Sequence, residues 1–392
     1  MVKGGGGAVN TYYIVSEMLS QGHRVLILAQ GGEREHKTSE NVNGTPVLRI
    51  PKPELPDKFW PLWPILEPFY LRRPLAALCG GFDSFVAIDP TYGLTFKRLY
   101  PDRPLIYRLE ATVRSHAAAV RSKVEESFSL KSGKLQAVRR LMRFENEAIE
   151  QFVWKKCDAL VVKSEFMKRE LATLYKFNTD KVRVIPNGVD FCRYSEAKPR
   201  TATLEQLGKD LAARTVIVYC GRLVRMKNVE FLLRSVAAMK MKDDCILAIL
   251  GDGEERKHLE ARARGLGISS NVRFIGKTDH VEEFLAAADI FVLPSTYEPF
   301  GNALIEAMAA GRPCVALKPD GIRIRTASAE IIQDGETGYL VPAEVFRLAG
   351  RLDDLVLNRD LRIRIGKRAQ IVCKERYDWS KCAREYVRLM EL

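Results

Sequence analysis

Features typical of a membrane-spanning, secreted or zinc-binding protein are missing from this sequence of 392 residues. No stretch approaches the roughly 18 consecutive apolar residues that a membrane-spanning helix needs. The opening Met-Val-Lys-Gly-Gly-Gly-Gly has no apolar core segment, so it is not a secretory signal. The eight cysteines are scattered without a Cys-x-x-Cys pair, which argues against a zinc site and against a disulfide framework. A cytoplasmic location is therefore expected.

The composition is that of a soluble globular protein, with 46% hydrophobic and 28% charged residues. A chain of this length predicts two domains. The net charge is +13, and Arg114 to Arg143 contains eight basic residues against Glu125 and Glu126. Such a segment either attracts anionic lipid headgroups or nucleic acid, or is simply a solvated helical surface. The aromatic, proline-broken stretch Phe59–Tyr70 also has two interpretations, a membrane-surface contact or core packing.

The second half of the chain alternates strands and helices. Apolar runs predict strands at Thr215–Cys220, Cys245–Leu250, Asn271–Ile275, Asp289–Pro294, Pro313–Leu317 and Thr337–Val341. Amphipathic patterns predict helices at Val229–Met239, Glu254–Arg264 and Val281–Ala287. Strands separated by such helices indicate βαβ units and a parallel sheet.

The first half shows the same alternation less clearly. We expect helices at Thr11–Ser20 and Phe144–Val153, and strands at His23–Ala29, Val47–Ile50, Ser84–Ile88, Leu105–Arg108, Ala159–Val162 and Val182–Ile185. Only three residues precede Gly4–Gly7, although a glycine loop that opens a helix should follow a strand. The N-terminal domain is therefore expected to lack its first, central strand, and truncation is the favoured explanation.

Two carboxylates flank the start of a predicted helix. Pro299 and Gly301 keep Glu298 off that helix, because proline disfavours helical geometry in the residue before it. Glu306 lies about one and a half turns into the helix at 3.6 residues per turn. The unpaired N–H groups at the helix start favour a phosphate between the two acids. This pattern indicates a nucleotide-sugar site.

These residues resemble the retaining family 4 glycosyltransferases of the GT-B fold, over most of the chain and most strongly from Cys157 onward. The motifs that carry the resemblance are Pro294-Ser295 before the acid pair, the loop Gly221-Arg222 to Lys227-Asn228, Gly251-Asp252-Gly253, Glu306 to Gly311, and the hinge-like Val184–Asp190. The resemblance implies two doubly wound, Rossmann-like domains facing a central cleft. The expected parts are residues 1–190 for the acceptor, 200–376 for the donor, and a terminal helix over 377–392 that crosses back.

The resemblance also implies a role for each matching residue. Arg222 and Lys227 are expected to bind the diphosphate and stabilise the leaving group, for which guanidinium and ammonium groups are suited. Glu298 is expected to hold hydroxyls of the transferred sugar, and is also the candidate nucleophile for a two-step reaction. Glu306 is expected to accept the ribose hydroxyls. The backbone at Phe300, Gly301 and Asn302 should contact the donor phosphates, as should the glycine loop at Gly6.

The acceptor side is less well defined. Glu110 follows the strand that ends near Tyr107, at a place where many relatives carry a histidine. It is either a hydroxyl-binding group or base for the acceptor, or a salt-bridge partner of Arg108 or Arg114. His116 is a second candidate. No Asp-x-Asp pair occurs in the chain, so neither a metal nor a cofactor is expected.

The predicted function is transfer of a sugar from a UDP- or GDP-sugar to a carbohydrate, lipid-linked or small-molecule acceptor, with retention and without a metal. Peripheral contact with an anionic membrane is compatible with the charge, and nucleic acid is not an expected partner. The alternatives are a non-enzymatic basic protein that binds anionic surfaces or nucleic acid, and a catalytically impaired relative. Salt-sensitive DNA binding without nucleotide-sugar binding would identify the first alternative.

Overall fold

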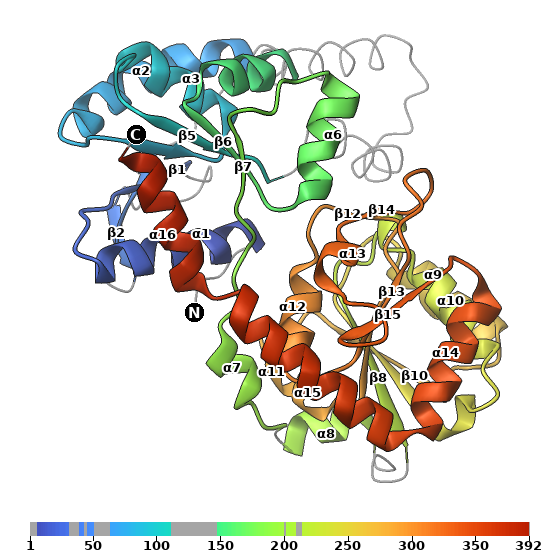
Figure 1. Cartoon of the computed structure of the whole chain (residues 1–392). Coiled ribbons are helices and arrows are strands. Elements are labelled where there is room, and N and C mark those ends of the chain that lie inside the picture. The colour runs from blue at the N-terminus through green and yellow to red at the C-terminus, as the bar shows by residue number, and fades with distance from the viewer. Residues whose placement is uncertain are drawn as a thin grey trace. The chain divides into compact units, whose positions relative to one another are not determined.

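The computed structural model describes residues 6–30, 39–42, 45–50, 63–110, 147–199, 201–208 and 214–391. The chain forms two compact units (Figure 1). Unit 1 contains Met1–Lys163, Lys168–Pro186 and Trp379–Leu392, and unit 2 contains Ser164–Met167 and Asn187–Asp378. Among the described residues, no helix combines the length and the apolar character needed to cross a membrane.

Unit 2 is built on one six-stranded parallel sheet, in the order β10-β9-β8-β11-β13-β15. Its strands are β8 (Thr215–Cys220), β9 (Cys245–Leu250), β10 (Val272–Gly276), β11 (Ile290–Leu293), β13 (Cys314–Leu317) and β15 (Gly338–Val341). The predicted strands are confirmed, each to within one residue at either end. Their apolar runs are long because helices cover both faces of a parallel sheet.

Helices and two single 3-10 turns precede, connect and follow these strands. They are α7 (Phe191–Ser195), α8 (Thr201–Leu207), η3 (Arg225–Lys227), α9 (Val229–Ala237), η4 (Lys242–Asp244), α10 (Arg256–Gly265), α11 (Val281–Ala287), α12 (Asn302–Ala309), α13 (Ser328–Ile331), α14 (Val345–Leu357) and α15 (Arg359–Arg376). In α9 the buried side chains Val229, Leu232, Leu233 and Val236 recur with the helical period, so one stripe of the helix packs on the sheet.

Unit 1 contains two separate sheets, β1-β3-β2 and β4-β5-β6-β7. The strands are β1 (Ile27–Gln30), β2 (Ser39–Val42), β3 (Thr45–Ile50), β4 (Phe85–Ala87), β5 (Leu105–Arg108), β6 (Ala159–Val162) and β7 (Val182–Val184). The first described element is α1 (Gly6–Ser20), and no strand among the described residues joins the two sheets. Residues 1–5, before which a first strand was expected to be missing, lie outside the described part of the chain.

The remaining helices lie mostly in unit 1: α1, α2 (Trp63–Cys79), α3 (Pro90–Leu99), residues 147–156, α6 (Glu165–Tyr175) and α16 (Trp379–Met390). Helix α2 corrects the expectation of a proline-broken stretch, because it continues through Pro68 and Pro74. Its Leu71 and Leu75 are buried, and this burial offsets the hydrogen bonds that the prolines remove. Residues 59–62 of that stretch lie outside the described part of the chain.

The C-terminal helix α16 packs on α1 within unit 1. Tyr13 of α1 stacks on Trp379 of α16, with ring centroids 5.3 Å apart and an interplanar angle of 9°. Ile14, Cys382 and Tyr386 are buried in the same cluster as Ile106 of β5. The last helix is thus part of the core of the N-terminal unit.

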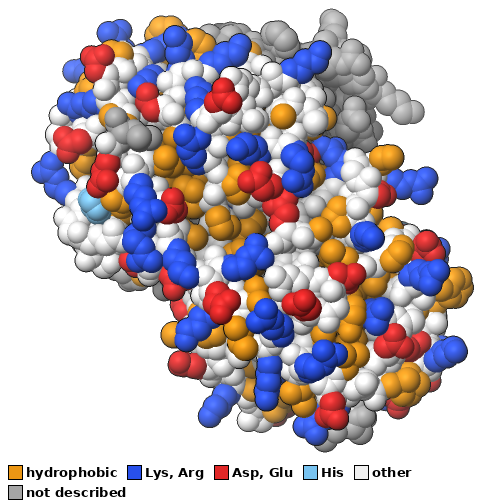
Figure 2. Space-filling model, viewed as in Figure 1, with side chains coloured by type: hydrophobic (Ala, Val, Ile, Leu, Met, Phe, Trp, Pro, Cys, Tyr) orange, Lys and Arg blue, Asp and Glu red, His pale blue; other side chains and the backbone are white. Residues whose placement is uncertain are grey.

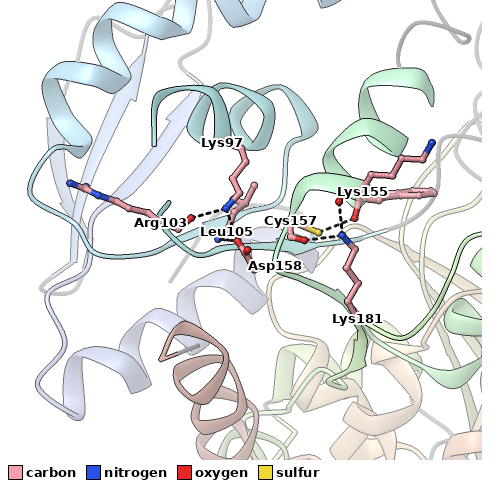
Figure 3. Close-up of polar contacts among 8 residues, drawn as sticks. Lys97, Arg103, Leu105, Lys155, Cys157, Asp158 and Lys181 are labelled. Carbon is pink, nitrogen blue, oxygen red and sulfur yellow. Dashed lines mark hydrogen bonds and ion pairs between the residues drawn. The ribbon is translucent and has the colours of Figure 1, made fainter. Parts of the chain in front are cut away.

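Polar contacts fix the amino ends of β5 and β6, as Figure 3 shows. Asp158 Oδ2 accepts a hydrogen bond from the Leu105 N–H at 2.8 Å and pairs with Lys97 Nζ at 2.8 Å. The Lys97 ammonium also donates to the Arg103 carbonyl at 3.0 Å. Lys181 Nζ donates to the carbonyls of Lys155 and Cys157 at 2.8 and 2.9 Å. These contacts fix the positions at which β5 and β6 begin relative to each other.

We expect Asp158→Ala to lower the free energy of unfolding of unit 1 by about 1–3 kcal/mol, because it leaves a part-buried N–H without its acceptor. Urea unfolding followed by circular dichroism would measure this loss. Asp102→Ala is the matched control, since Asp102 is exposed in the turn before β5. Equal midpoints for the two variants would contradict the role given to Asp158.

Candidate functional site

The candidate site lies at the carboxyl ends of β8 and β11, which are neighbours in the sheet of unit 2. The chain runs from β8 to β9 on one side of this pair and from β11 to β13 on the other. Loops that follow the two strands therefore diverge, and ligands of doubly wound sheets bind at such a switch point. Gly221 to Lys227 follow β8, and Pro294 to Gly301 follow β11.

Lys227 and Glu298 form an ion pair between these two loops. Their side chains are 16% and 13% exposed, so both charges are largely removed from solvent. The turn η3, which carries Lys227, is attached to the β11 loop, because Thr296 donates both its N–H and its hydroxyl to the Met226 carbonyl, at 2.9 and 3.1 Å. The sequence motifs suggested separate roles for Lys227 and Glu298, but the two side chains are in direct contact.

Glycines after β9 hold the β8 loop in place. A Cβ at Gly251, where φ is +128°, would lie 1.9 Å from the Gly221 carbonyl oxygen. A Cβ at Gly253 would lie 2.3 Å from the Leu223 carbonyl oxygen. The Leu223 N–H donates to the Asp252 carbonyl at 2.9 Å, so the two loops pack backbone against backbone. This close approach explains why the motif requires small residues.

Arg222 is exposed, and no contact of its guanidinium is found among the described residues. Its backbone is fixed, because the buried Tyr219 hydroxyl donates to the Arg222 carbonyl at 3.1 Å. Burial raises the pKa of Tyr219, which the Glu298 carboxylate raises further and the Arg222 guanidinium lowers. Arg222 and Glu298 therefore both lie near the end of β8.

Glu298 is not on a loop, as its neighbouring proline had suggested, but in the short strand β12 (Tyr297–Glu298). This strand pairs in parallel with β14 (Arg325–Thr326). The Glu298 carbonyl accepts from the Ala327 N–H at 2.9 Å. The backbone that carries the carboxylate is thus held by a second strand, which local sequence did not reveal because two-residue strands have no periodicity.

Helix α12 begins beside Glu298. Its N-cap is Gly301, with φ of 107°, and no side chain caps the helix. The Leu304 N–H donates to the Gly301 carbonyl at 2.9 Å, so the helix start leaves the N–H groups of Asn302 and Ala303 for an anion. The side chain of Phe300 is 5% exposed and packs edge-on against Tyr377, so only its backbone faces the site. The Asn302 side chain accepts from Asn187 Nδ2 at 2.7 Å.

Glu306 lies in α12, one turn in from Asn302, and is partly buried. Burial raises its pKa to about 7, against the lowering effects of the Arg193 guanidinium and of the nearby Tyr194 side chain. Burial raises the pKa of the Cys220 thiol, at the last residue of β8. The Glu306 carboxylate raises this pKa further and the Lys227 ammonium lowers it, so both side chains lie near the end of β8. Sequence reasoning did not identify Tyr194, because it lies more than 100 positions from Glu306 in the chain.

The acceptor-side candidates belong to unit 1 and are described separately. Glu110 pairs with Arg108 at 3.2 Å (Oε1 to Nε) and with Lys163 at 2.5 Å (Oε2 to Nζ). The salt-bridge interpretation of Glu110 is therefore observed, with Lys163 as an additional partner. Gly6 is the first residue of α1. His116 and the basic segment Arg114–Arg143 lie outside the described residues.

The surface charge visible in Figure 2 is mixed. Lysine and arginine side chains lie among aspartates and glutamates over this face of the molecule. On this face, the described residues thus do not form the broad basic area that binding to nucleic acid would require.

Two family models match the chain. Residues 4–193 match Glycosyltransferase Family 4, and residues 205–372 match Glycosyl transferases group 1. An uncharacterized glycosyltransferase of Methanocaldococcus jannaschii is 26% identical over 396 aligned positions, covering 99% of this chain and 94% of that protein.

Solved structures share the fold. Sucrose-phosphate synthase from Thermosynechococcus elongatus superposes with a TM-score of 0.76 at 20% identity, over 99% of this chain and 93% of that one. The Anabaena protein HepE in complex with UDP-glucose superposes with a TM-score of 0.73 at 19% identity, over 99% and 96% of the two chains. The architecture is GT-B, with two Rossmann-like domains.

Proposed function

The chain belongs to glycosyltransferase family 4, and on that premise we propose that it transfers a sugar from a UDP- or GDP-sugar to a carbohydrate, lipid-linked or small-molecule acceptor, with retention of configuration. The observation that carries the proposal is the convergence of two cations, two carboxylates and a helix start at the switch point of unit 2. Each group suits one part of a nucleotide-sugar: Arg222 and Lys227 the diphosphate, Glu298 the sugar and Glu306 the ribose.

The mechanism that we propose needs neither a metal nor a cofactor besides the donor. As the sugar–phosphate bond breaks, negative charge grows on the leaving diphosphate. Arg222, Lys227 and the first N–H groups of α12 would stabilise this charge from fixed positions. The Lys227 ammonium is held by Glu298, and the turn that carries it is held by Thr296 through the Met226 carbonyl, so little reorganisation is required when the charge appears.

The ion pair with Lys227 bears on how retention is achieved. A carboxylate bonded to an ammonium has part of its charge neutralised and is a weaker nucleophile. Glu298 is therefore better suited to orient sugar hydroxyls than to form a covalent intermediate. This favours substitution on one face of the sugar, with the leaving phosphate helping to deprotonate the acceptor.

A thermal-shift panel of UDP-, GDP- and ADP-sugars tests the donor assignment, with UDP-glucose first because HepE was solved with it. A ligand that binds only the native state raises the melting temperature. We expect one nucleotide class to stabilise the protein and Arg222→Ala to weaken the shift. The control is Arg225→Ala, in the same loop. A panel without any shift in the unchanged protein would contradict the proposed function.

A further inference from the structure

The segment Ser164–Met167, where α6 begins, belongs to unit 2. Ser164 is only 3% exposed, and its hydroxyl makes two hydrogen bonds. The Met167 N–H donates to Ser164 Oγ at 3.1 Å, which is the usual bond of a serine that caps a helix start. The same hydroxyl donates to the Pro299 carbonyl at 2.6 Å. Ser164 therefore binds the loop between Glu298 and α12.

Two further contacts hold this segment in place. The Glu165 N–H donates to Glu330 Oε2 at 2.8 Å, and Glu330 lies in α13. The ring of Phe166 packs edge-on against Tyr297 of β12, with ring centroids 6.0 Å apart and an interplanar angle of 64°. Three consecutive residues thus contact unit 2 at or near β12, which holds the serine hydroxyl beside the Pro299 carbonyl.

The Pro299 carbonyl shares a peptide group with the Phe300 N–H. This peptide is trans, and in a planar trans peptide the carbonyl and the N–H point in opposite directions. A hydroxyl that holds the carbonyl therefore also fixes the direction of the N–H, on the side away from Ser164. The preceding peptide group is held as well, because the Glu298 carbonyl accepts from the Ala327 N–H at 2.9 Å.

The Phe300 N–H is the first of three consecutive donors where α12 begins. Among the described residues, no acceptor is found for the N–H groups of Phe300, Gly301 and Asn302. Gly301 has a φ of 107°, in the left-handed region, and successive N–H groups around such a residue form a concavity that suits an anion. The direction of each N–H then decides how well the anion is bound.

We propose that Ser164 is a positioning residue for the donor: by binding the Pro299 carbonyl, it directs the Phe300 N–H toward the diphosphate. The hydroxyl does not touch the donor and acts through the peptide group. A donor that is already oriented stabilises the charge of the leaving diphosphate without rearrangement. This inference rests on the proposed function, because it requires that the diphosphate binds where α12 begins.

The first test is the affinity of the full chain for inorganic pyrophosphate, measured by calorimetry. Ser164→Gly is the decisive variant, because glycine is nearly as favourable as serine at a helix start but has no hydroxyl. We expect it to bind pyrophosphate about tenfold more weakly, the effect of losing one well-directed hydrogen bond to a charged ligand. Ser164→Thr keeps a hydroxyl that both donates and accepts, so it should bind as the unchanged protein does.

Asn358→Ala is the matched control for the loss of a helix cap. The Asn358 side chain caps α15, where it accepts from the Leu361 N–H at 2.9 Å. This variant should lower the melting temperature and leave the pyrophosphate affinity unchanged. An equal loss of affinity in Asn358→Ala and Ser164→Gly would show that general destabilisation causes the effect, and would overturn the inference.

The amide resonance of Phe300 gives a readout that a purely structural role of Ser164 would not change. In protein labelled with 15N-phenylalanine, this resonance is identified by its loss in Phe300→Leu. Pyrophosphate should shift it strongly in the unchanged protein and much less in Ser164→Gly. Equal shifts in the two proteins would contradict the proposed orientation of the N–H.

The outcomes separate this inference from the proposed function. If Ser164→Gly binds pyrophosphate as tightly as the unchanged protein, Ser164 only caps α6, and the donor assignment stands. If the unchanged protein does not bind pyrophosphate, the anion site at the beginning of α12 is wrong, and the role of Ser164 falls together with the donor assignment.

Discussion

Lys227→Ala is expected to lower kcat for sugar transfer by roughly 10²–10³-fold, the typical effect of removing one fixed group that stabilises transition-state charge. Lys227 is largely buried against Glu298 at the switch point, where a charge acts more strongly than in water. The effect should appear mainly in kcat, because the diphosphate gains charge as the bond to the sugar breaks. Initial rates at saturating donor would measure it.

Removing Lys227 also leaves Glu298 as a buried charge without its partner, which by itself destabilises a protein. The double variant Lys227→Ala/Glu298→Gln separates the two effects: it should recover stability without recovering kcat. Arg225→Ala is the matched control, because Arg225 lies in the same turn η3 and is exposed. Near-normal turnover of Lys227→Ala, or an equal loss in Arg225→Ala, would contradict the placement of the site.

Gly251→Ala is expected to prevent stable folding of unit 2, with a loss of more than about 4 kcal/mol in the free energy of unfolding. Two causes combine. The new Cβ would lie 1.9 Å from the Gly221 carbonyl oxygen, which is backbone and cannot rotate away. The φ of +128° is also strained for any residue with a Cβ. Yield of soluble protein and the thermal transition would show the loss.

Gly265→Ala provides the matched control for this substitution. Gly265 is the last residue of α10, and a Cβ there would have no atom within 4 Å. Alanine has a higher helix propensity, so this variant should be unchanged or more stable by up to about 1 kcal/mol. If Gly251→Ala melts like Gly265→Ala, the backbone packing between the β8 and β9 loops is not as described.

Much of unit 2 was predictable from the sequence. Strands such as β8 and β9 are continuous apolar runs, and α11 has a clear amphipathic period, so their positions follow from local pattern alone. Prediction was poorer where the pattern is interrupted. Helix α2 contains two prolines and was not recognised, because burial of Leu71 and Leu75 outweighs the local preference. Strand β12 has two residues and therefore no period at all.

By itself, the sequence determined the order of strands and helices along the chain and the residue types suited to binding a nucleotide-sugar, because both follow from the spacing of neighbouring residues. Only the tertiary structure decided which of these residues meet. The ion pair of Lys227 with Glu298 joins segments 71 positions apart and depends on β8 and β11 lying side by side. Contacts of this kind follow from the order of strands in the sheet, which no local pattern encodes.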